Sequence, residues 1–302
     1  MTGFAVREAE ERDAPGVRRL CVQLSRCDYL LRAWGDWMRT PGDLNLVAES
    51  EGRIVGCVHA GLLSPSETFL QGLRVDPARR RQGVGGRLMA ELSARLRQRG
   101  VEVQRAVTAE GNGPARRLLA ALGWREVHAV VRRRRKSAGA VGTVGAVAAG
   151  VERPSLELVT EIVGRQPRVA SRPGLAFFRR IYFAAGAASI ADAVAAGLVL
   201  GAGDACAFLD PPGNGKLWLH SFAGPTAASL RLLAKLIDPG AGSCRTVSAL
   251  VPLIVEASVE AEIQSGLDTL GFEPAGPGDR YLVLEAPTGA AGSPALAHRR
   301  HE

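Results

Sequence analysis

The sequence predicts a mixed α+β fold made of two tandem copies. The first half contains three consecutive strand-like segments with turn residues between them, followed by alternating helical and strand patterns. The second half repeats that alternating order with different residues. The 302 residues suit about two domains, and a composition with 46% hydrophobic and 23% charged residues excludes a disordered or fibrous chain.

The elements of the first half follow from apolar spacing and turn chemistry. Phe4–Arg7 has strand character, Asp13 is placed to cap a helix, and a short second helix is expected over Tyr29–Met38. The turns that follow favour antiparallel hairpins between three strands, expected over Leu44–Glu49, Ile54–Leu62 and Thr68–Val75. A helix, a strand, a helix and a strand then close this half, expected over Gly85–Arg99, Glu102–Val107, Gly113–Leu122 and Trp124–Val131.

The second half carries a similar series of elements. Its strands are expected over Lys216–Phe222, Thr246–Val251 and Tyr281–Glu285, and its helices over Thr226–Ile237 and Val259–Leu270. Residues 119–124, LAALGW, also match residues 267–272, LDTLGF, because each hexamer is a helix end followed by glycine and an aromatic residue. This match supports a tandem pair of related domains. Such helix endings are common, so a chance match is the alternative.

A change in composition indicates where the two halves meet. Five basic residues, Arg132–Lys136, precede a stretch that is almost entirely Ala, Gly and Val. We interpret the basic run as a solvated strand end beside a linker. The expected limits are a first domain at 1–136, a linker at 137–154, a second domain at 155–288 and a flexible tail at 289–302.

Several classes of protein are not expected. The N-terminus lacks the basic and apolar regions of a secretory signal, and no weakly polar stretch reaches the ~20 residues that span a bilayer, so a cytoplasmic protein without a membrane partner is expected. The five cysteines are scattered, as expected for reduced thiols, and the histidines lack ligand spacing, so no metal is expected. A net charge of +8 leaves a nucleic-acid binder as an alternative, but the basic run has no interleaved aromatic residues, so we do not expect this partner.

The most informative segment, residues 73–88, reads LRVDPARRRQGVGGRL. A strand ends, a basic turn follows, and Gly83, Gly85 and Gly86 open an amphipathic helix. Glycines let backbone N–H groups approach a ligand closely, and a helix start carries partial positive charge, so the pattern predicts a phosphate-binding turn. A Walker loop would end in Gly-Lys-Ser/Thr, and a Rossmann turn would need Gly or Ala where Leu88 stands, so both are rejected.

The segment and its surroundings resemble the GNAT superfamily of acyl-CoA-dependent N-acetyltransferases. Arg80–Gly85 reads Arg-x-x-Gly-x-Gly, Leu-x-Val-x-Pro precedes it, and Asn112, Ala115 and Gly123-Trp124 follow. The resemblance covers the first half and implies a mixed, mostly antiparallel central sheet flanked by helices, with acetyl-CoA as cosubstrate. The residues that it implies for cofactor binding are Leu73, Arg74, Val75, Arg80, Arg81, Gln82, Gly83, Val84, Gly85, Gly86, Arg87, Asn112 and Ala115.

The implied reaction is direct attack of a neutral amine on the thioester carbonyl in a ternary complex. The sequence departs from the family at two positions: Leu119 replaces the tyrosine that often protonates the leaving thiolate, and Gln71 stands where a related enzyme has a basic glutamate. Glu67 is the first candidate for the base, and Tyr29 is retained beside it as a catalytic candidate. His59 and Asp28 are further candidates. A catalytically silent CoA-binding sensor is the alternative.

A narrower resemblance concerns the acceptor. Asp28-Tyr29-Leu30 with Trp37, and residues 67–69 leading into residues 72–75, look like the vertebrate histidine N-acetyltransferase group. This implies a small-molecule amine acceptor such as a free amino acid. The aromatic residues of the short helix are equally suited to the acceptor wall and to the core.

The second half has no counterpart of the Arg-x-x-Gly-x-Gly turn. Residues 222–225, FAGP, stand where it should be, and proline removes an amide donor. We therefore expect the second copy to be degenerate, shaping or covering the acceptor site without binding CoA. The sequence leaves the acceptor, the acyl length and the oligomeric state open, a homodimer included.

Overall fold

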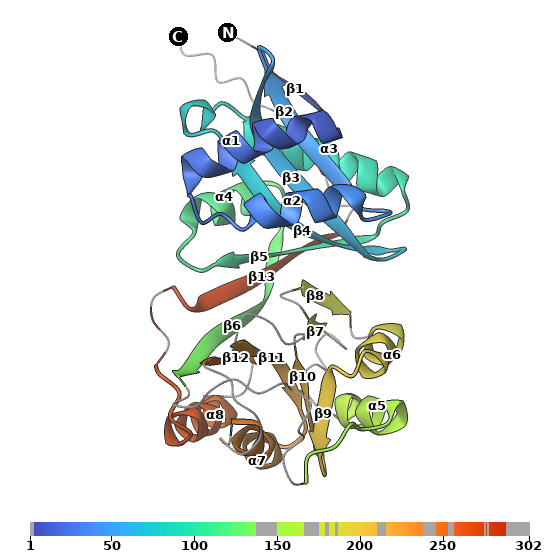
Figure 1. Ribbon diagram of the computed structural model, residues 1–302, viewed down its shortest axis with the longest axis vertical. Helices are drawn as coiled ribbons and strands as arrows, with labels where there is room; N and C mark the ends of the chain where they lie inside the picture. The colour runs from blue at the N-terminus through green and yellow to red at the C-terminus, as the bar shows by residue number, and fades with distance from the viewer. Residues whose placement is uncertain are drawn as a thin grey trace. The chain divides into compact units, whose positions relative to one another are not determined.

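The computed structural model describes residues 3–136, 150–165, 175–178, 181–184, 187–209, 216–237, 246–252, 257–274, 276 and 278–287. The described chain forms two compact units. The first takes residues from Met1–Thr108, Asn112–Glu126 and the stretch from Leu284 onward, and the second takes Ala109–Gly111 and Val127–Val283. Figure 1 shows helices and strands in each unit.

The first unit holds a mixed, mostly antiparallel sheet, as expected. Its sheet order is β1-β2-β3-β4-β5, in which every neighbouring pair is antiparallel except the parallel pair β4–β5. The elements are β1 (Ala5–Glu8), the 3-10 turn η1 (Glu11–Asp13), α1 (Ala14–Leu24), α2 (Leu30–Arg39), β2 (Leu44–Ser50), β3 (Arg53–Ser64), β4 (Glu67–Val75), the 3-10 turn η2 (Pro77–Arg79), α3 (Val84–Gln98), β5 (Val103–Ala109) and α4 (Gly113–Ala121).

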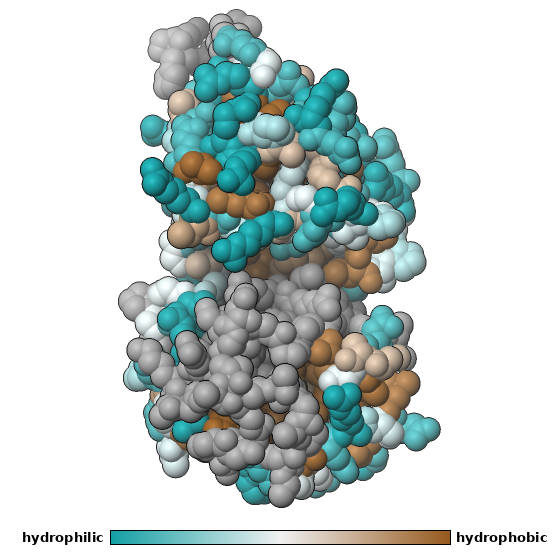
Figure 2. Space-filling view, viewed as in Figure 1, coloured by the Kyte–Doolittle hydropathy of each residue, from teal (hydrophilic) through white to brown (hydrophobic). Residues whose placement is uncertain are grey.

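Helices cover both faces of this sheet. Helices α1 and α2 pack on Val47 of β2 and Cys57 of β3, and in Figure 1 they lie in front of the strands. Helix α3 packs on the other face, where a Cβ added to Gly56 would lie 2.9 Å from Leu88. Successive strand residues point to opposite faces of the sheet. Gly56 therefore faces α3, and Cys57 faces α1 and α2. The visible surface over α1 and α2 is mostly hydrophilic, as amphipathic helices require (Figure 2).

Asp13 does not cap α1 as expected, since no side-chain hydrogen bond joins it to that helix. Its carboxylate instead accepts hydrogen bonds from both terminal nitrogens of Arg7, at 2.7 and 2.8 Å, and from the backbone N–H of Glu10 at 2.8 Å. Arg7 also bonds Glu49 of β2. The guanidinium is the stronger partner for this buried carboxylate, because it carries a full opposite charge and donates two parallel hydrogen bonds.

The second unit repeats the mixed sheet, with the order β6-β12-β11-β10-β9, and β11–β12 is its parallel pair. Strand β13 passes from the second unit into the first at Leu284. The elements are β6 (Arg125–Lys136), α5 (Leu156–Gly164), β7 (Leu175–Phe178), β8 (Ile181–Ala184), α6 (Ala187–Ala195), β9 (Val199–Ala202), β10 (Ala205–Leu209), β11 (Lys216–Ala223), α7 (Thr226–Ile237), β12 (Thr246–Pro252), α8 (Ala257–Thr269) and β13 (Arg280–Pro287).

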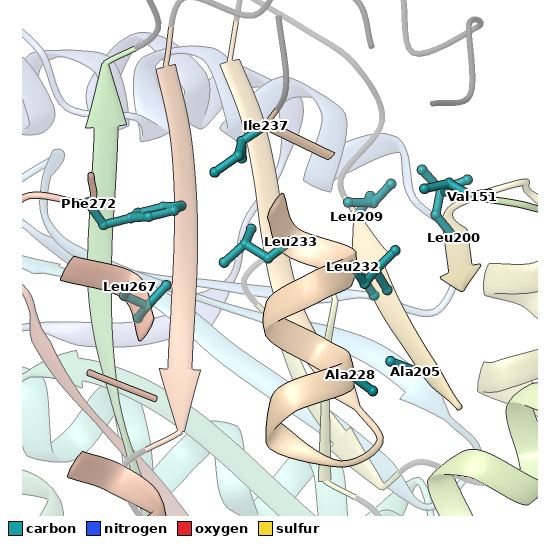
Figure 3. Packing of buried hydrophobic residues seen from close by; sticks show 11 residues of the cluster. Val151, Leu200, Ala205, Leu209, Ala228, Leu232, Leu233, Ile237, Leu267 and Phe272 are labelled. Atoms are coloured by element: carbon teal, nitrogen blue, oxygen red, sulfur yellow. The ribbon is translucent and has the colours of Figure 1, made fainter. Parts of the chain in front are cut away.

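Successive residues of β10 contribute alternately to two hydrophobic clusters. Ala205, Ala207 and Leu209 pack against α7 and α8, where Leu232 and Leu233 are fully buried (Figure 3). The intervening residues of β10 join a second cluster with α5 and α6. All five residues of β10 are buried, so the strand has no polar face. This explains why polar–apolar alternation did not reveal it in the sequence.

The repeated hexamer forms the same helix ending in both units, which confirms the predicted ending. The N–H of Trp124 donates to the carbonyl of Leu119 at 3.0 Å, and the N–H of Phe272 donates to that of Leu267 at 2.9 Å. The intervening glycines have φ of +81° and +76°. Glycine supplies this left-handed conformation without a Cβ penalty, and the buried aromatic residue then fixes the chain exit.

The basic run is not the solvated strand end that we expected. Strand β6 continues to Lys136 and pairs antiparallel with β12. The Arg133 side chain is 4% exposed and contacts Asp268, while Arg132 and Arg134 both contact Asp279. Asp268 and Asp279, which come much later in the chain, therefore pair with arginines that have no acidic neighbour in the sequence.

The expected domain limits stay a prediction. The expected tail and most of the expected linker, residues 137–149, lie outside the described residues. Within the end of the linker, Glu152 forms a backbone bridge with Gly201. Among the described helices none has the length and apolar character needed to cross a membrane.

Candidate active site

Strand β4 contains a bulge halfway along its pairing with β3. Gln71 lies opposite His59 and Arg74 lies opposite Cys57, so Gly72 and Leu73 together face a single residue of β3. Gly72 has φ of +71°, and a Cβ added there would lie 2.9 Å from the Trp37 ring. Both conditions require glycine, so the bulge is built into the local sequence and its packing.

The bulge lies where β4 parts from β5. Parallel pairing joins only Glu67–Leu70 to Val103–Ala106, although β4 continues to Val75 and β5 to Ala109. Past that point β4 has no β5 partner in the register. A parallel pair that opens in this way leaves backbone polar groups for a ligand to use.

The start of α3 is an open set of amide donors. Gly83 precedes the helix with φ of +81°, and a Cβ added there would meet nothing within 4 Å. No side chain caps this 15-residue helix, and its first intrahelical bond runs from the Arg87 N–H to the Gly83 carbonyl. The preceding N–H groups therefore have no intrahelical acceptor, and the helix dipole adds to their positive potential. Such a terminus suits phosphate oxygens.

A tyrosine contacts the bulge from the start of α2. The hydroxyl oxygen of Tyr29 accepts a hydrogen bond from the Gly72 N–H at 3.1 Å. The Arg74 guanidinium lies 5.3 Å from the centre of the Tyr29 ring and donates to Asp28 at 2.7 and 2.9 Å. Partial desolvation at the bulge raises the pKa of Tyr29, although 47% of the residue remains exposed, so the phenol is protonated at neutral pH. Burial also opposes ionisation of Asp28, but the bonds and charge of Arg74 together with the bond from the Leu30 N–H outweigh it and leave its pKa lowered.

Beneath this group lies a buried polar network that sequence reasoning did not find. The His59 and Trp37 rings stack with centroids 4.0 Å apart. His59 Nδ1 lies 3.0 Å from Asn45 Oδ1, whose amide nitrogen donates to the Trp37 carbonyl at 3.2 Å. Burial lowers the pKa of His59 to about 3, so its neutral ring donates through Nδ1. His59 Nε2 then faces Asp43 at 3.6 Å. His59 is 1% exposed, which makes it a core residue.

Glu67, the first candidate base, begins β4 inside a buried ion cluster. Its Oε2 lies 3.0 Å from Nη1 of Arg105, which also bonds Glu285 at 3.0 Å. The Arg105 side chain is 6% exposed. Gly72 of the bulge lies five positions after Glu67, roughly 17 Å along an extended strand. The role of Glu67 as a base stays a prediction.

Known proteins match this architecture. Residues 5–124 match the model of the Acetyltransferase (GNAT) family. This segment is similar to GNAT acetyltransferase domains. A search of the curated proteins found no match.

Solved structures extend the likeness of fold to both units. A GCN5-related N-acetyltransferase from Sphaerobacter thermophilus is 16% identical, with 94% of this chain and 96% of that chain covered and a TM-score of 0.61. A tandem GNAT protein from the clavulanic acid biosynthesis pathway, described without AcCoA, is 16% identical over 95% and 99%, with a TM-score of 0.56. A GCN5-related N-acetyltransferase from Kribbella flavida is 19% identical over 94% and 70%, with a TM-score of 0.53.

Several of the residues expected to bind the cofactor lie around the open end of α3, within the segment that matches this family. Arg80, Arg81, Gln82 and Arg87 are exposed there, and the backbone of Gly83–Gly86 supplies the amides. The side chain of Val84 is 2% exposed in the core, so only its backbone is available.

Three other expected cofactor residues already have partners. Asn112 accepts from the Ala115 N–H at 3.4 Å and donates to Thr108 at 3.0 Å, and so caps α4. The Arg74 side chain is held by Asp28. Leu73 and Val75 are half-buried beyond the point where β4 leaves β5. Leu119, at the position of the family tyrosine, is buried.

In the described part of the second unit, the connection from β11 to α7 does not form an equivalent turn. Gly224 follows β11 directly and α7 begins at Thr226. A Cβ added to Gly224 would lie 2.2 Å from the Asp204 carbonyl oxygen, whereas the space around Gly83 is empty. A side chain therefore has room at Gly83 and none at Gly224.

Proposed function

We propose that the GNAT domain transfers the acetyl group of acetyl-CoA to a primary amine of a small molecule, by direct attack in a ternary complex. One observation carries the proposal: an uncapped, sterically open helix start follows a bulged strand that has parted from its parallel neighbour. The chemistry that acetyl-CoA supplies is an activated acyl carbon.

The chain's own residues divide the binding among themselves. The amides of Gly83–Arg87 bind the diphosphate, with Arg80 and Arg81 adding charge-assisted bonds. Leu73 and Val75 present apolar side chains and free backbone edges to the pantetheine arm. Near the bulge a backbone N–H is positioned to stabilise negative charge on the carbonyl oxygen as the amine attacks.

The acceptor in this proposal is the α-amine of a free amino acid or a similar compound. The resemblance to the histidine N-acetyltransferase group supports this class, and Tyr29 and Trp37 stand beside the bulge as aromatic walls. In this proposal Glu67 deprotonates the incoming ammonium before the attack, through a chain of waters because it lies five positions before the bulge. The second unit, which lacks the open turn, binds no CoA in this proposal. A cytoplasmic location belongs to it as well, supported by the free thiols of the described residues.

The direct test mixes the protein with acetyl-CoA and a panel of free amino acids, amines and aminoglycosides while following thiol release. We expect release with at least one amine and one CoA site per chain by calorimetry. Binding without release for any amine would favour the silent sensor, which the departures at Leu119 and Gln71 support. Salt-dependent binding to DNA or RNA without acetyl transfer would instead favour a nucleic-acid binder.

A glycine pair in the same domain gives a matched control for cofactor binding. Gly83 and Gly100 have φ of +81° and +80°, and a Cβ at either meets nothing within 4 Å. Gly83→Val and Gly100→Val therefore impose similar backbone strain, but only the first lies at the open helix start. We expect Gly83→Val alone to abolish measurable CoA binding. Equal affinities for the two variants would refute the assignment of the turn.

A further inference from the structure

The hydroxyl of Tyr29 is incompletely bonded in the first unit. Its oxygen accepts from the Gly72 N–H at 3.1 Å, but no acceptor for its own proton is present among the described residues. Asp28 is the nearest acid in sequence, and both of its carboxylate oxygens are taken by Arg74. Tyr29 is 47% exposed, so the phenol is open to a ligand. The hydroxyl therefore keeps its own proton available for a ligand atom that binds at the strand bulge.

The surroundings of Tyr29 suit an oxygen that loses and regains a proton. The Gly72 N–H donates to the oxygen, and the Arg74 guanidinium lies over the ring, so both stabilise a phenolate once it forms. Asp28 holds Arg74 in place with two hydrogen bonds. Trp37 packs edge-on against the ring with centroids 6.0 Å apart and limits its rotation. The hydroxyl is therefore held in position at the bulge.

We propose that the Tyr29 hydroxyl protonates the departing CoA thiolate. This inference rests on the proposed acetyl transfer. As the amine nitrogen bonds to the carbonyl carbon, the C–S bond breaks and its electron pair stays on sulfur. The Tyr29 proton moves to that sulfur and yields CoA thiol. The phenolate then regains a proton from the ammonium formed in the attack, directly or through water, so protons and charge balance.

The rest of the domain leaves this role vacant. Leu119 has no proton to donate and is buried in α4. His59 is buried and bonded to Asn45, and Cys57 is fully buried. Gln71 precedes the bulge but carries no acidic proton. Tyr29 thus supplies from α2 what a residue of α4 does not.

The main test is Tyr29→Phe, which removes one oxygen and keeps the ring over Arg74. We expect kcat to fall about 100-fold, while KM for acetyl-CoA changes by less than about twofold. Tyr281→Phe is the matched control, because Arg132 lies over the Tyr281 ring at 5.5 Å in the same way, in the second unit. That variant should keep its kcat. The pH profile adds a second readout, since the loss of kcat as the phenol ionises at high pH should vanish in Tyr29→Phe.

Two further experiments separate chemistry from structure. In Tyr29→Phe, adding Leu119→Tyr should restore roughly tenfold of the lost kcat by supplying a phenol from α4. By calorimetry, CoA should bind roughly threefold more tightly than desulfo-CoA to the wild type, and this preference should disappear in Tyr29→Phe, without any turnover.

The outcomes distinguish this inference from the proposed function. A wild type that releases no thiol with any amine contradicts the function, and the desulfo-CoA comparison then decides on the Tyr29–sulfur contact alone. An active wild type with unchanged kcat in Tyr29→Phe overturns the inference and leaves the function standing. Tyr29→Phe could also lose kcat while it still binds CoA more tightly than desulfo-CoA and still loses kcat at high pH. That result would give Tyr29 a purely structural role and would also overturn the inference.

Discussion

Acidification should destabilise the first unit through His59. Burial lowers the pKa of this ring from 6.5 to about 3 in the folded protein. Between these values the unfolded chain binds one proton more than the native one, so stability falls as the pH falls, by about 1.4 kcal/mol per pH unit. From neutral pH down to about pH 4.5 the loss is about 2.7 kcal/mol. Asp43 acts in the opposite direction, because burial raises its pKa and the native state takes up its proton first.

Urea unfolding followed by tryptophan fluorescence measures this loss at about pH 7 and about pH 4.5. His59→Gln keeps an amide donor for Asn45 and removes the titration. Its free energy of unfolding should drop on acidification by about 2.7 kcal/mol less than that of the wild type. Asp43→Asn should lose more unfolding free energy on acidification than the wild type does, because it lacks the opposing contribution of Asp43. Equal acid losses in wild type and His59→Gln would refute a buried neutral imidazole.

Three other changes test separate parts of the first unit. Gly72→Ala, at φ of +71°, should lower kcat by distorting the bulge, as measured by initial rates with intact CoA binding. Arg105→Leu leaves the carboxylates of Glu285 and Glu67 largely buried without their cation. This change should lower the free energy of unfolding in urea by about 3 kcal/mol. The bond from Arg7 lowers the pKa of Asp13, so its stabilisation is present above pH 3.8 and lost as pH falls through the folded value; Asp13→Asn should flatten the acid limb of thermal melts.

Local pattern predicted most elements of the fold because their signals lie within a few residues. Helix α7 was predicted with its observed bounds, Thr226–Ile237, since its apolar period begins just after Pro225. Strands β9 and β10 escaped prediction because burial on both faces removes the alternation that marks a strand. The run at Arg132–Lys136 was misread because its carboxylate partners lie far along the chain.

For the site, the glycine turn at residues 83–86 was readable because one contiguous segment contains the strand end, the left-handed glycine and the helix start. The network of Asn45 and Asp43 around His59 was not, because its members come from three segments that only the folded chain brings together. The narrower acceptor assignment and the roles of Glu67 and the second unit stay predictions.

The amino-acid order by itself determined the helix periods, the turns and the glycine turn before α3, because these depend on residues that are neighbours in the chain. The tertiary structure decided which side chains form hydrogen bonds and ion pairs with one another. The Gly72 N–H donates to the Tyr29 hydroxyl, although the two residues are 43 positions apart in the chain. That N–H lies in a bulge that forms where β4 pairs with β3. Strand register and burial are set by distant partners, so a titrating group acquires its chemistry only after the chain has packed.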